Sequence, residues 1–364
     1  MRNFKGIKRL VVKIGTNLLT KGNTLNVAYM DTICRQIALL KNRGIQVLLV
    51  SSGAIGMGAA ALGLRSKVSE VKMRQACAAI GQPLLMHQYS ESFRAYSVPV
   101  AQVLLTREVF NNRKTFLNLK NSVETLLSLG VIPVINENDS ISTAEIGTAF
   151  GDNDSLSAYV ASKVEAELLV ILTDIDGLYR RDPRQDPQAE LVKIVHEVTP
   201  EILRFAGNEG SAFSTGGMKT KLNAAVIAGA AGCKTIIAHG QKDAILLRLL
   251  DGEEEGTLFL AGERRSARAR WILNSVPSGK IRIDEGALNA LRRNKSLLPS
   301  GIVSVEGIFD AGEVVSINEC AHGVSSFTSR EIENLIGRHS AEIESIVGAG
   351  RRDVIARPED IVFL

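Results

Sequence analysis

The segment at residues 10–17 reads Leu10-Val11-Val12-Lys13-Ile14-Gly15-Thr16-Asn17. Its first five residues are apolar and mostly β-branched apart from one lysine, and such residues favour strands. A strand with so few polar positions has no face for water, which is typical of a parallel sheet covered on both sides. Gly15 allows the backbone to approach a bound group, and Lys13 can neutralise an anion there. Many strands end in lysine and glycine, so this segment alone does not define a site.

Five more apolar runs follow at residues 46–50, 98–105, 131–135, 168–172 and 235–238. Helical patterns separate them. Between the first two strands, apolar residues recur at helical spacing from Val27 to Leu40, and Gly44 is placed to end that helix. Buried strands that alternate with helices predict an α/β fold with a largely parallel sheet.

The pattern changes after Gly262. Residues 263–270 are basic and polar, as in a linker or an exposed helix. From Ser278 onward, short strand-like segments at 280–283, 301–305 and 313–317 alternate with glycines and turns. We therefore predict a first domain at 1–262, a linker at 263–277 and a small, mostly β domain at 278–364. A length of 364 residues also favours two domains.

Charge is distributed unevenly along the chain. The net charge is +4, but residues 278–364 carry 10 Lys or Arg against 13 Asp or Glu, which leaves 33 against 26 in the remainder. A basic first domain suits an anionic ligand, although an ordinary mixed surface gives the same balance. The four cysteines form no CxxC pair, which argues against a zinc site or a disulfide framework and for a reducing compartment.

Targeting signals are not evident in the sequence. Residues 1–8 lack the apolar core of a signal peptide, and no uninterrupted apolar run reaches the roughly 18 residues of a membrane helix. We therefore expect a soluble, cytoplasmic protein.

Polar loops follow several of the predicted strands, and in open α/β sheets ligands bind beyond the carboxyl ends of strands. The loop at 51–58 contains Ser52 and a loose match to a dinucleotide-binding fingerprint at 56–61. That match does not directly follow the strand, and no further strand ends in an acid about 20 positions on, so we do not expect a nicotinamide cofactor. The backbone amides of this loop are alternatively suited to a carboxylate or a phosphate.

Two clusters of acids and amides come next, Asn136-Glu137-Asn138-Asp139 and Gly151-Asp152-Asn153-Asp154. Their side chains suit an ammonium and a carboxylate, or Mg²⁺ with its waters. Asx-rich turns and a helix N-cap are the alternative structural interpretations.

Two further loops suit a nucleotide. Thr173-Asp174 follows one strand, and the segment Thr215-Gly216-Gly217-Met218-Lys219-Thr220-Lys221 opens a helix. A glycine turn at a helix N-terminus with two lysines favours an anion, although solvated lysines at an ordinary helix start fit as well. No GxxxxGK[ST] motif occurs, and the set of sequence motifs that marks protein kinases is missing. None of the five histidines lies in these loops.

Taken in order, these segments resemble the glutamate 5-kinase (gamma-glutamyl kinase) family of the amino acid kinase superfamily. The segments with the most specific match are Asn136–Asp139 and Thr215–Met218. The resemblance covers nearly the whole chain, and residues 280–309 resemble the start of a PUA domain. It implies a three-layer αβα sandwich, the amino acid kinase fold, with a PUA-like domain at the C-terminus.

The resemblance also implies roles for individual residues. Catalysis would fall to Lys13 and Lys221 as cations, organised by Asp154. Glutamate would be bound by Ser52, Asp139 and Asn153. ATP would be bound by Lys13, Thr173 and Asp174 and by the loop residues Thr215, Gly216, Gly217, Met218, Lys219, Thr220 and Lys221. Two departures from the family pattern stand out, since Asn17 replaces a common serine and the stretch at 147–150 is longer than in some members.

The implied reaction is ATP-dependent phosphorylation of the γ-carboxylate of L-glutamate to γ-glutamyl phosphate, the first step of proline biosynthesis. Mg²⁺ would accompany ATP, with no direct protein ligand assigned. The resemblance further implies a homo-oligomer, proline as feedback inhibitor and a glutamyl phosphate reductase as downstream partner.

Two alternatives remain open. The first is a kinase for acetylglutamate, aspartate or carbamate. The second is an RNA-binding protein that uses the PUA-like domain. RNA binding needs clustered cations, and the C-terminal domain is acidic, so we do not expect a nucleic-acid partner. The arginines at 264, 265, 268 and 270 are the feature that favours RNA, and a solvated linker explains them more simply.

Overall fold

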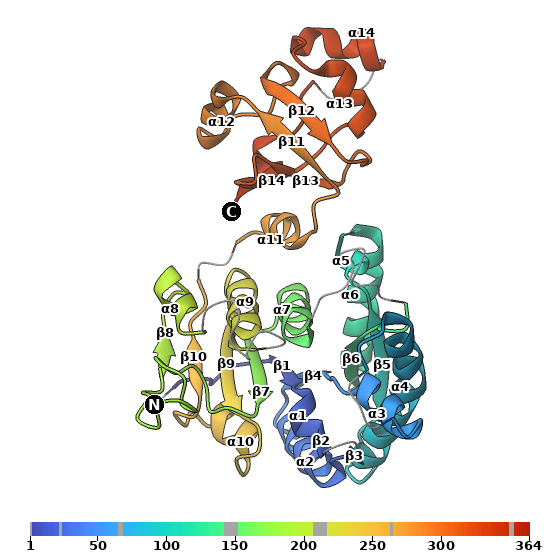
Figure 1. Ribbon diagram of the computed structural model, residues 1–364, viewed down its shortest axis with the longest axis vertical. Coiled ribbons are helices and arrows are strands. Elements are labelled where there is room, and N and C mark those ends of the chain that lie inside the picture. The colour runs from blue at the N-terminus through green and yellow to red at the C-terminus, as the bar shows by residue number, and fades with distance from the viewer. Residues whose placement is uncertain are drawn as a thin grey trace. The chain divides into compact units, whose positions relative to one another are not determined.

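The computed structural model describes residues 2–21, 24–64, 68–111, 113–141, 152–206, 217–262, 265–348 and 353–364. The chain divides into two compact units (Figure 1). The first unit contains residues 1–107 and 117–264, and the second contains residues 108–116 and 265–364. Each unit has its own sheet, so each is described by itself.

An eight-stranded sheet forms the centre of the first unit, in the order β5-β6-β4-β1-β7-β9-β10-β8. The six strands from β5 to β9 in that order run parallel, whereas β10 is antiparallel to β9 and pairs in parallel with β8. The strands are β1 Arg9–Ile14, β4 Gln46–Val50, β5 Val100–Leu105, β6 Ile132–Glu137, β7 Leu168–Thr173, β8 Ile194–Val195, β9 Lys234–His239 and β10 Thr257–Phe259.

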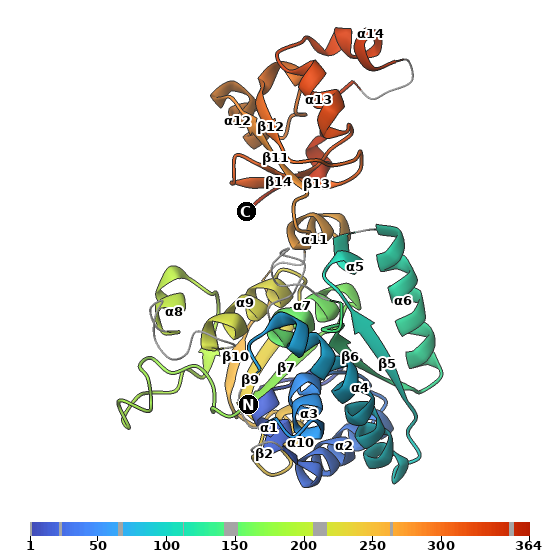
Figure 2. The ribbon, with the colours of Figure 1, turned by 45° about the vertical axis from the view of Figure 1, so that its right-hand side comes forward.

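Helices cover the sheet on both faces, which explains why its central strands carry almost no polar residues. On one face, Leu10, Val12 and Ile14 of β1 belong to a core shared with α2 (Val27–Asn42), α4 (Val71–Arg94) and α10 (Ile245–Leu250). On the opposite face lie α7 (Asn153–Lys163) and α9 (Met218–Gly229), side by side in Figures 1 and 2. Side chains alternate along a strand, so Lys13 points towards α7. The predicted three-layer, largely parallel fold is confirmed.

The remaining elements of the first unit are short or peripheral. They are α1 (Thr16–Leu19), β2 (Thr20–Lys21), β3 (Thr24–Leu25), α3 (Ala54–Ala61) and α8 (Pro200–Arg204), together with α6 (Arg113–Ser128), which belongs to this unit from Leu117 onward. In the described part of the chain, no helix combines the length and apolar character that spanning a lipid bilayer requires.

Strand boundaries differ from the sequence prediction in two places. Asn136 and Glu137 belong to β6, although we predicted that the strand ends at residue 135. The two side chains therefore point to opposite faces of the sheet. The antiparallel strands β8 and β10 were not predicted, because two and three residues are too few to show an alternating pattern.

A close contact between α3 and α4 depends on two glycines. A Cβ atom on Gly58 would lie 1.8 Å from the carbonyl oxygen of Cys77, and one on Gly81 would lie 1.9 Å from the carbonyl oxygen of Ala54. The loose dinucleotide fingerprint at 56–61 thus lies inside α3, where Gly58 serves helix packing.

The second unit contains a five-stranded sheet in the order β12-β11-β13-β14-β15. Its strands are β11 Gly279–Ile283, β12 Ile302–Glu306, β13 Val314–Ile317, β14 Ala321–Val324 and β15 Ile361–Phe363. Its helices of four or more residues are α5 Glu108–Asn111, α11 Ala267–Asn274, α12 Glu285–Arg292, α13 Ser329–Leu335 and α14 Ile343–Val347. A core around Phe327, Ile317 and Ile332 holds the unit together, which confirms the predicted β-rich C-terminal part.

The described part of the basic stretch, from residue 265, belongs to this unit. Residues 267–274 form α11, in which Ile272 is fully buried and Arg270 is 5% exposed. Arg268 forms an ion pair with the buried carboxylate of Asp360. Of the two interpretations of this stretch, a linker or an exposed helix, the structure has a helix from Ala267 onward, in which Arg268 is exposed. Arg270 is buried, because the apolar face of α11 packs on the sheet of the second unit.

The contact between α3 and α4 predicts a clear difference between two glycine substitutions. Gly81→Ala should lower the free energy of unfolding of the first unit by about 1–3 kcal/mol, because the new methyl group overlaps backbone. Gly56→Ala, in α3, is the matched control, since its Cβ meets no atom within 4 Å. Gly56→Ala should raise the free energy of unfolding of the first unit by about 0.5–1 kcal/mol, because alanine has a higher helix propensity than glycine. Urea unfolding of both variants tests this, and equal effects would contradict the packing role.

Candidate active site

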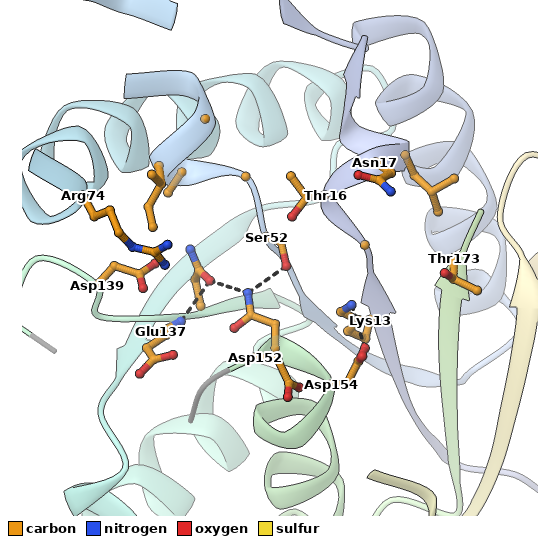
Figure 3. A pocket seen from close by; sticks show the side chains of 18 of the residues that line it. Lys13, Thr16, Asn17, Ser52, Arg74, Glu137, Asp139, Asp152, Asp154 and Thr173 are labelled. Atoms are coloured by element: carbon orange, nitrogen blue, oxygen red, sulfur yellow. Dashed lines mark hydrogen bonds and ion pairs between the residues drawn. The ribbon is translucent and has the colours of Figure 1, made fainter. Parts of the chain in front are cut away.

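A pocket of about 650 Å³ lies at the carboxyl ends of β1, β4, β6 and β7 (Figure 3). Parallel strands present these ends at one edge of the sheet, so loops that are far apart in sequence meet there. Eight of the residues to which the resemblance gives a role line the pocket: Lys13, Ser52, Asp139, Asn153, Asp154, Thr173, Asp174 and Lys221.

Asp154 joins two buried lysines at one end of the pocket. Its Oδ1 lies 2.6 Å from Nζ of Lys13, and its Oδ2 lies 3.0 Å from Nζ of Lys221. All three side chains are nearly inaccessible, with exposures of 1% for Asp154, 6% for Lys13 and 5% for Lys221. Thr220 donates a further hydrogen bond to Oδ2 at 2.8 Å.

The electrostatics of this cluster favour an anion. Burial alone would raise the pKa of Asp154, but the charges of Lys13 and Lys221 hold that pKa below its usual value, so the carboxylate stays ionised. The ammonium groups of Lys13 and Lys221 both lie at the pocket wall, where they can also meet the charge of an anionic ligand.

Helix starts place two of these groups. Asp152 is the N-cap of α7 and accepts from the backbone N–H of Ser155 at 2.7 Å, which sets Asp154 in the first helical turn. Burial also raises the pKa of Asp152. Gly217 is the N-cap of α9, and Lys221 lies in the second turn of that helix.

The loop after β1 is tied to the loop after β7. The side-chain amide of Asn17 donates to Asp174 at 2.9 Å, and the hydroxyl of Thr173 donates to the other carboxylate oxygen at 3.1 Å. Burial opposes ionisation of Asp174, but the hydrogen bond from Asn17 and those from its neighbours lower its pKa. Asn17 therefore orients an acid at the pocket wall, which a serine is less able to reach.

Amides dominate the opposite end of the pocket. Nδ2 of Asn153 lies 2.8 Å from the carbonyl oxygen of Ser51, 2.8 Å from Oγ of Ser52 and 2.9 Å from Oδ1 of Asn136. The end of β4, the end of β6 and the start of α7 are thus joined by one side chain.

Two acids and one arginine lie beside these amides. Figure 3 shows the guanidinium of Arg74 next to the carboxylate of Asp139, with Glu137 close by. Burial, followed by the charge of Glu137, raises the pKa of Asp139 to about 6, while Arg74 opposes that rise. This end of the pocket therefore presents both signs of charge, which suits a zwitterion.

Arg74 was not found from the sequence. It belongs to the second turn of α4, together with the lining residue Gln75. The segment at 68–75 follows no predicted strand and contains no glycine loop, so only the tertiary fold brings it to the pocket.

The proposed nucleotide loop is only partly described. Thr215 and Gly216 lie outside the described residues, as does the stretch at 147–150. Met218 borders a second pocket of about 510 Å³, formed mainly by residues 175–186 and 204–206. Lys219 is exposed, and the described lining of neither pocket includes it or Gly217.

Among the described residues, no group of three or more His, Cys, Asp or Glu side chains is arranged to hold a metal ion.

The parallel sheet, and a pocket at its strand ends with two buried lysines, fit an amino acid kinase, and comparison with known proteins shows that the chain belongs to that family. Residues 8–239 match the amino acid kinase family and residues 279–347 match the PUA domain. The fold also resembles the carbamate kinase from Giardia lamblia bound to AMP-PNP, with a TM-score of 0.52 and 15% identity over 71% of this chain and 99% of that one.

Relatives that match over nearly the full length allow a more specific family assignment. The chain is 44% identical to the glutamate 5-kinase of Methanosarcina mazei, over 99% of this chain and 97% of that protein. It is 47% identical to the glutamate 5-kinase of Geobacter sulfurreducens, over 98% of each. The chain therefore belongs to the glutamate 5-kinase family.

Proposed function

We propose that the first pocket is the active site of an ATP-dependent glutamate 5-kinase. The chain transfers the γ-phosphoryl group of ATP to the γ-carboxylate of L-glutamate, which gives γ-glutamyl phosphate and ADP at the entry to proline biosynthesis. The observation that carries the proposed site is the pair of buried lysines held on Asp154 at the pocket wall.

This reaction needs no general base, because a γ-carboxylate with a pKa near ~4.3 is already ionised at neutral pH. Its oxygen attacks the γ-phosphorus in line, the new O–P bond forms, and the bond to the β-phosphate oxygen breaks with its electrons leaving on ADP. The protein must supply position and positive charge for the phosphoryl group in transit. Lys13 and Lys221 supply that charge, and Asp154 holds both ammonium groups in place before the substrates arrive.

Glutamate binds at the amide end of the pocket. Asp139 and Asn153 offer oxygen acceptors for its ammonium group, and the hydroxyl of Ser52 offers a donor for a carboxylate. This orientation directs the γ-carboxylate towards the lysines.

ATP binds from the side of β7 and α9. We expect Thr173, Asp174 and the loop at 215–221 to bind the phosphates, and Lys13 to contact the transferred group. The nucleoside extends into the second pocket, because Ile175 directly follows Asp174 and Met218 precedes Lys221 by less than one helical turn.

Mg²⁺ accompanies ATP and neutralises phosphate charge. Mg²⁺ commonly keeps several waters and takes one or two carboxylates plus phosphate oxygens. Among the described residues, Asp152 and Asp174 line the pocket and would supply such carboxylates.

We propose a catalytic domain at 1–262, a connection at 263–277 that contains α11, and a PUA-like domain at 278–364. We also propose a homo-oligomeric, cytoplasmic enzyme that is inhibited by proline and supplies a glutamyl phosphate reductase. RNA binding is disfavoured, because Arg270 is buried, Arg268 is paired with Asp360 and the C-terminal part is acidic.

Substrate identity can be tested with one assay. ADP release is measured with ATP and Mg²⁺ in the presence of glutamate, acetylglutamate, aspartate or carbamate, and hydroxylamine traps any acyl phosphate. We expect hydroxamate only with glutamate. If hydroxamate forms with acetylglutamate or aspartate, or if ADP is released only with carbamate, the protein is still a kinase but glutamate is not its substrate.

Loss of one buried lysine should slow the chemical step. Lys221→Ala removes a preorganised charge from the transition state, so kcat should fall by about a hundredfold or more. Lys193→Ala, an exposed lysine that lines neither pocket, is the control and should leave kcat unchanged. Steady-state kinetics with circular dichroism checks both, and near-normal kcat in Lys221→Ala would exclude its catalytic role.

The raised pKa of Asp139 predicts a pH dependence of glutamate binding. Below about pH 6 this carboxyl is protonated and no longer attracts an ammonium group. The kcat/KM for glutamate should therefore fall as the pH drops through about 6, while the KM for ATP changes little. Asp139→Asn should lower the kcat/KM for glutamate at pH 8 by about tenfold or more. In this variant the kcat/KM should no longer fall as the pH drops through about 6. An unchanged pH profile in that variant would assign the titration to another group.

A further inference from the structure

A line of side-chain amides runs from the edge of the sheet to the glutamate end of the pocket. Oε1 of Gln102, on β5, accepts from Nε2 of Gln82 at 3.1 Å. Oε1 of Gln82, on α4, accepts from Nδ2 of Asn136 at 2.9 Å. Oδ1 of Asn136 accepts from Nδ2 of Asn153 at 2.9 Å. We call Gln102, Gln82, Asn136 and Asn153 the amide relay.

The relay is buried at its centre, where orientation matters most. Asn136 is 1% exposed and Gln82 is 7% exposed. A buried amide that faces the wrong partner loses hydrogen bonds and sets like groups against each other. The centre of the relay therefore has one favourable arrangement of oxygens and NH₂ groups.

Asn136 is oriented from two sides. Its Oδ1 also accepts from the backbone N–H of Glu137 at 2.9 Å, a group that can only donate. Its NH₂ group must then point towards α4, and Gln82 supplies the acceptor there. A flipped Asn136 would turn its NH₂ group towards two donors, the Glu137 N–H and the Asn153 amide.

This orientation decides what the pocket presents to a ligand. Because the NH₂ group of Asn153 faces three acceptors, the polar atom that remains for the pocket is its Oδ1, an acceptor. Because Oγ of Ser52 accepts from Asn153, its own O–H hydrogen is directed elsewhere, as a donor. An ammonium group can donate to Oδ1 of Asn153, and a carboxylate can accept from the hydroxyl of Ser52.

We propose that Gln82 is a positioning residue for substrate specificity. It fixes the amide of Asn136 and thereby the donor and acceptor polarity of Asn153 and Ser52, without touching the substrate. This inference rests on the proposed glutamate role of Ser52 and Asn153. Gln82 acts on glutamate binding in the ground state and the transition state alike, so its effect falls on KM.

The test compares three variants of one helix in the full-length enzyme. Gln82→Met keeps the length of the side chain but removes its acceptor, and should raise the KM for glutamate about tenfold. The KM for ATP and kcat should stay within about threefold, which a general loss of structure would not give. Gln82→Glu retains an acceptor for Asn136 and should keep the KM for glutamate within about threefold of wild type. Gln88→Met is the matched control, because Gln88 also lies on α4 but bonds only Ser92 among the described residues.

Several outcomes would overturn the proposal. An unchanged KM for glutamate in Gln82→Met, an equal rise in the KM for ATP, or a tenfold rise in Gln82→Glu would each do so. If Gln82→Met does not fold, Gln82→Ala takes its place with the same expectations, since it adds no bulk. A wild-type enzyme without glutamate-dependent ADP release would overturn the proposed function itself, and this inference with it.

Discussion

The carboxylate of Asp154 is the interaction on which the first unit depends, because it makes two buried lysines tolerable. Lys13 comes from the central strand and Lys221 from α9, and neither side chain has appreciable contact with water. An ammonium group taken out of water is strongly disfavoured unless a counter-charge lies close. Asp154 provides that counter-charge to both, at 2.6 and 3.0 Å. Strand, helix and pocket are thus tied together by one acid.

The rest of the site is arranged around that cluster by the geometry of the parallel sheet. β1 lies at the centre, with β4 and β7 as its neighbours, so the loops after these three strands surround Lys13. The positive end of the pocket lies between β1, α7 and α9, whereas the amide end lies between β4, β6 and α4. One substrate can therefore bridge a site for phosphoryl transfer and a site for recognition.

A strand or a site residue could be predicted from the sequence where a short, continuous stretch of residues carries the pattern that marks it. The strands were evident because continuous apolar runs need no partner to be recognised, and the convergence of Lys13, Asp154 and Lys221 followed from family resemblance together with the rule that strand ends meet. The strands β8 and β10, at one end of the sheet, were missed because they are two and three residues long. Arg74 and Gln82 were missed because helical residues without a local motif gain a role only when the fold brings α4 to β6. The functional roles of all these residues remain predictions.

The position of β1 in the sheet has a consequence for the synthesis of the protein. β1 ends at residue 14, but it pairs with β7, which begins at residue 168. Contacts between residues so distant in sequence form slowly. Until the ribosome has made β7, one edge of β1 has no partner, and until it has made α7, Lys13 has no Asp154 to bind. A nascent chain that stalls before residue 168 exposes an apolar strand edge, the kind of surface that recruits chaperones or aggregates.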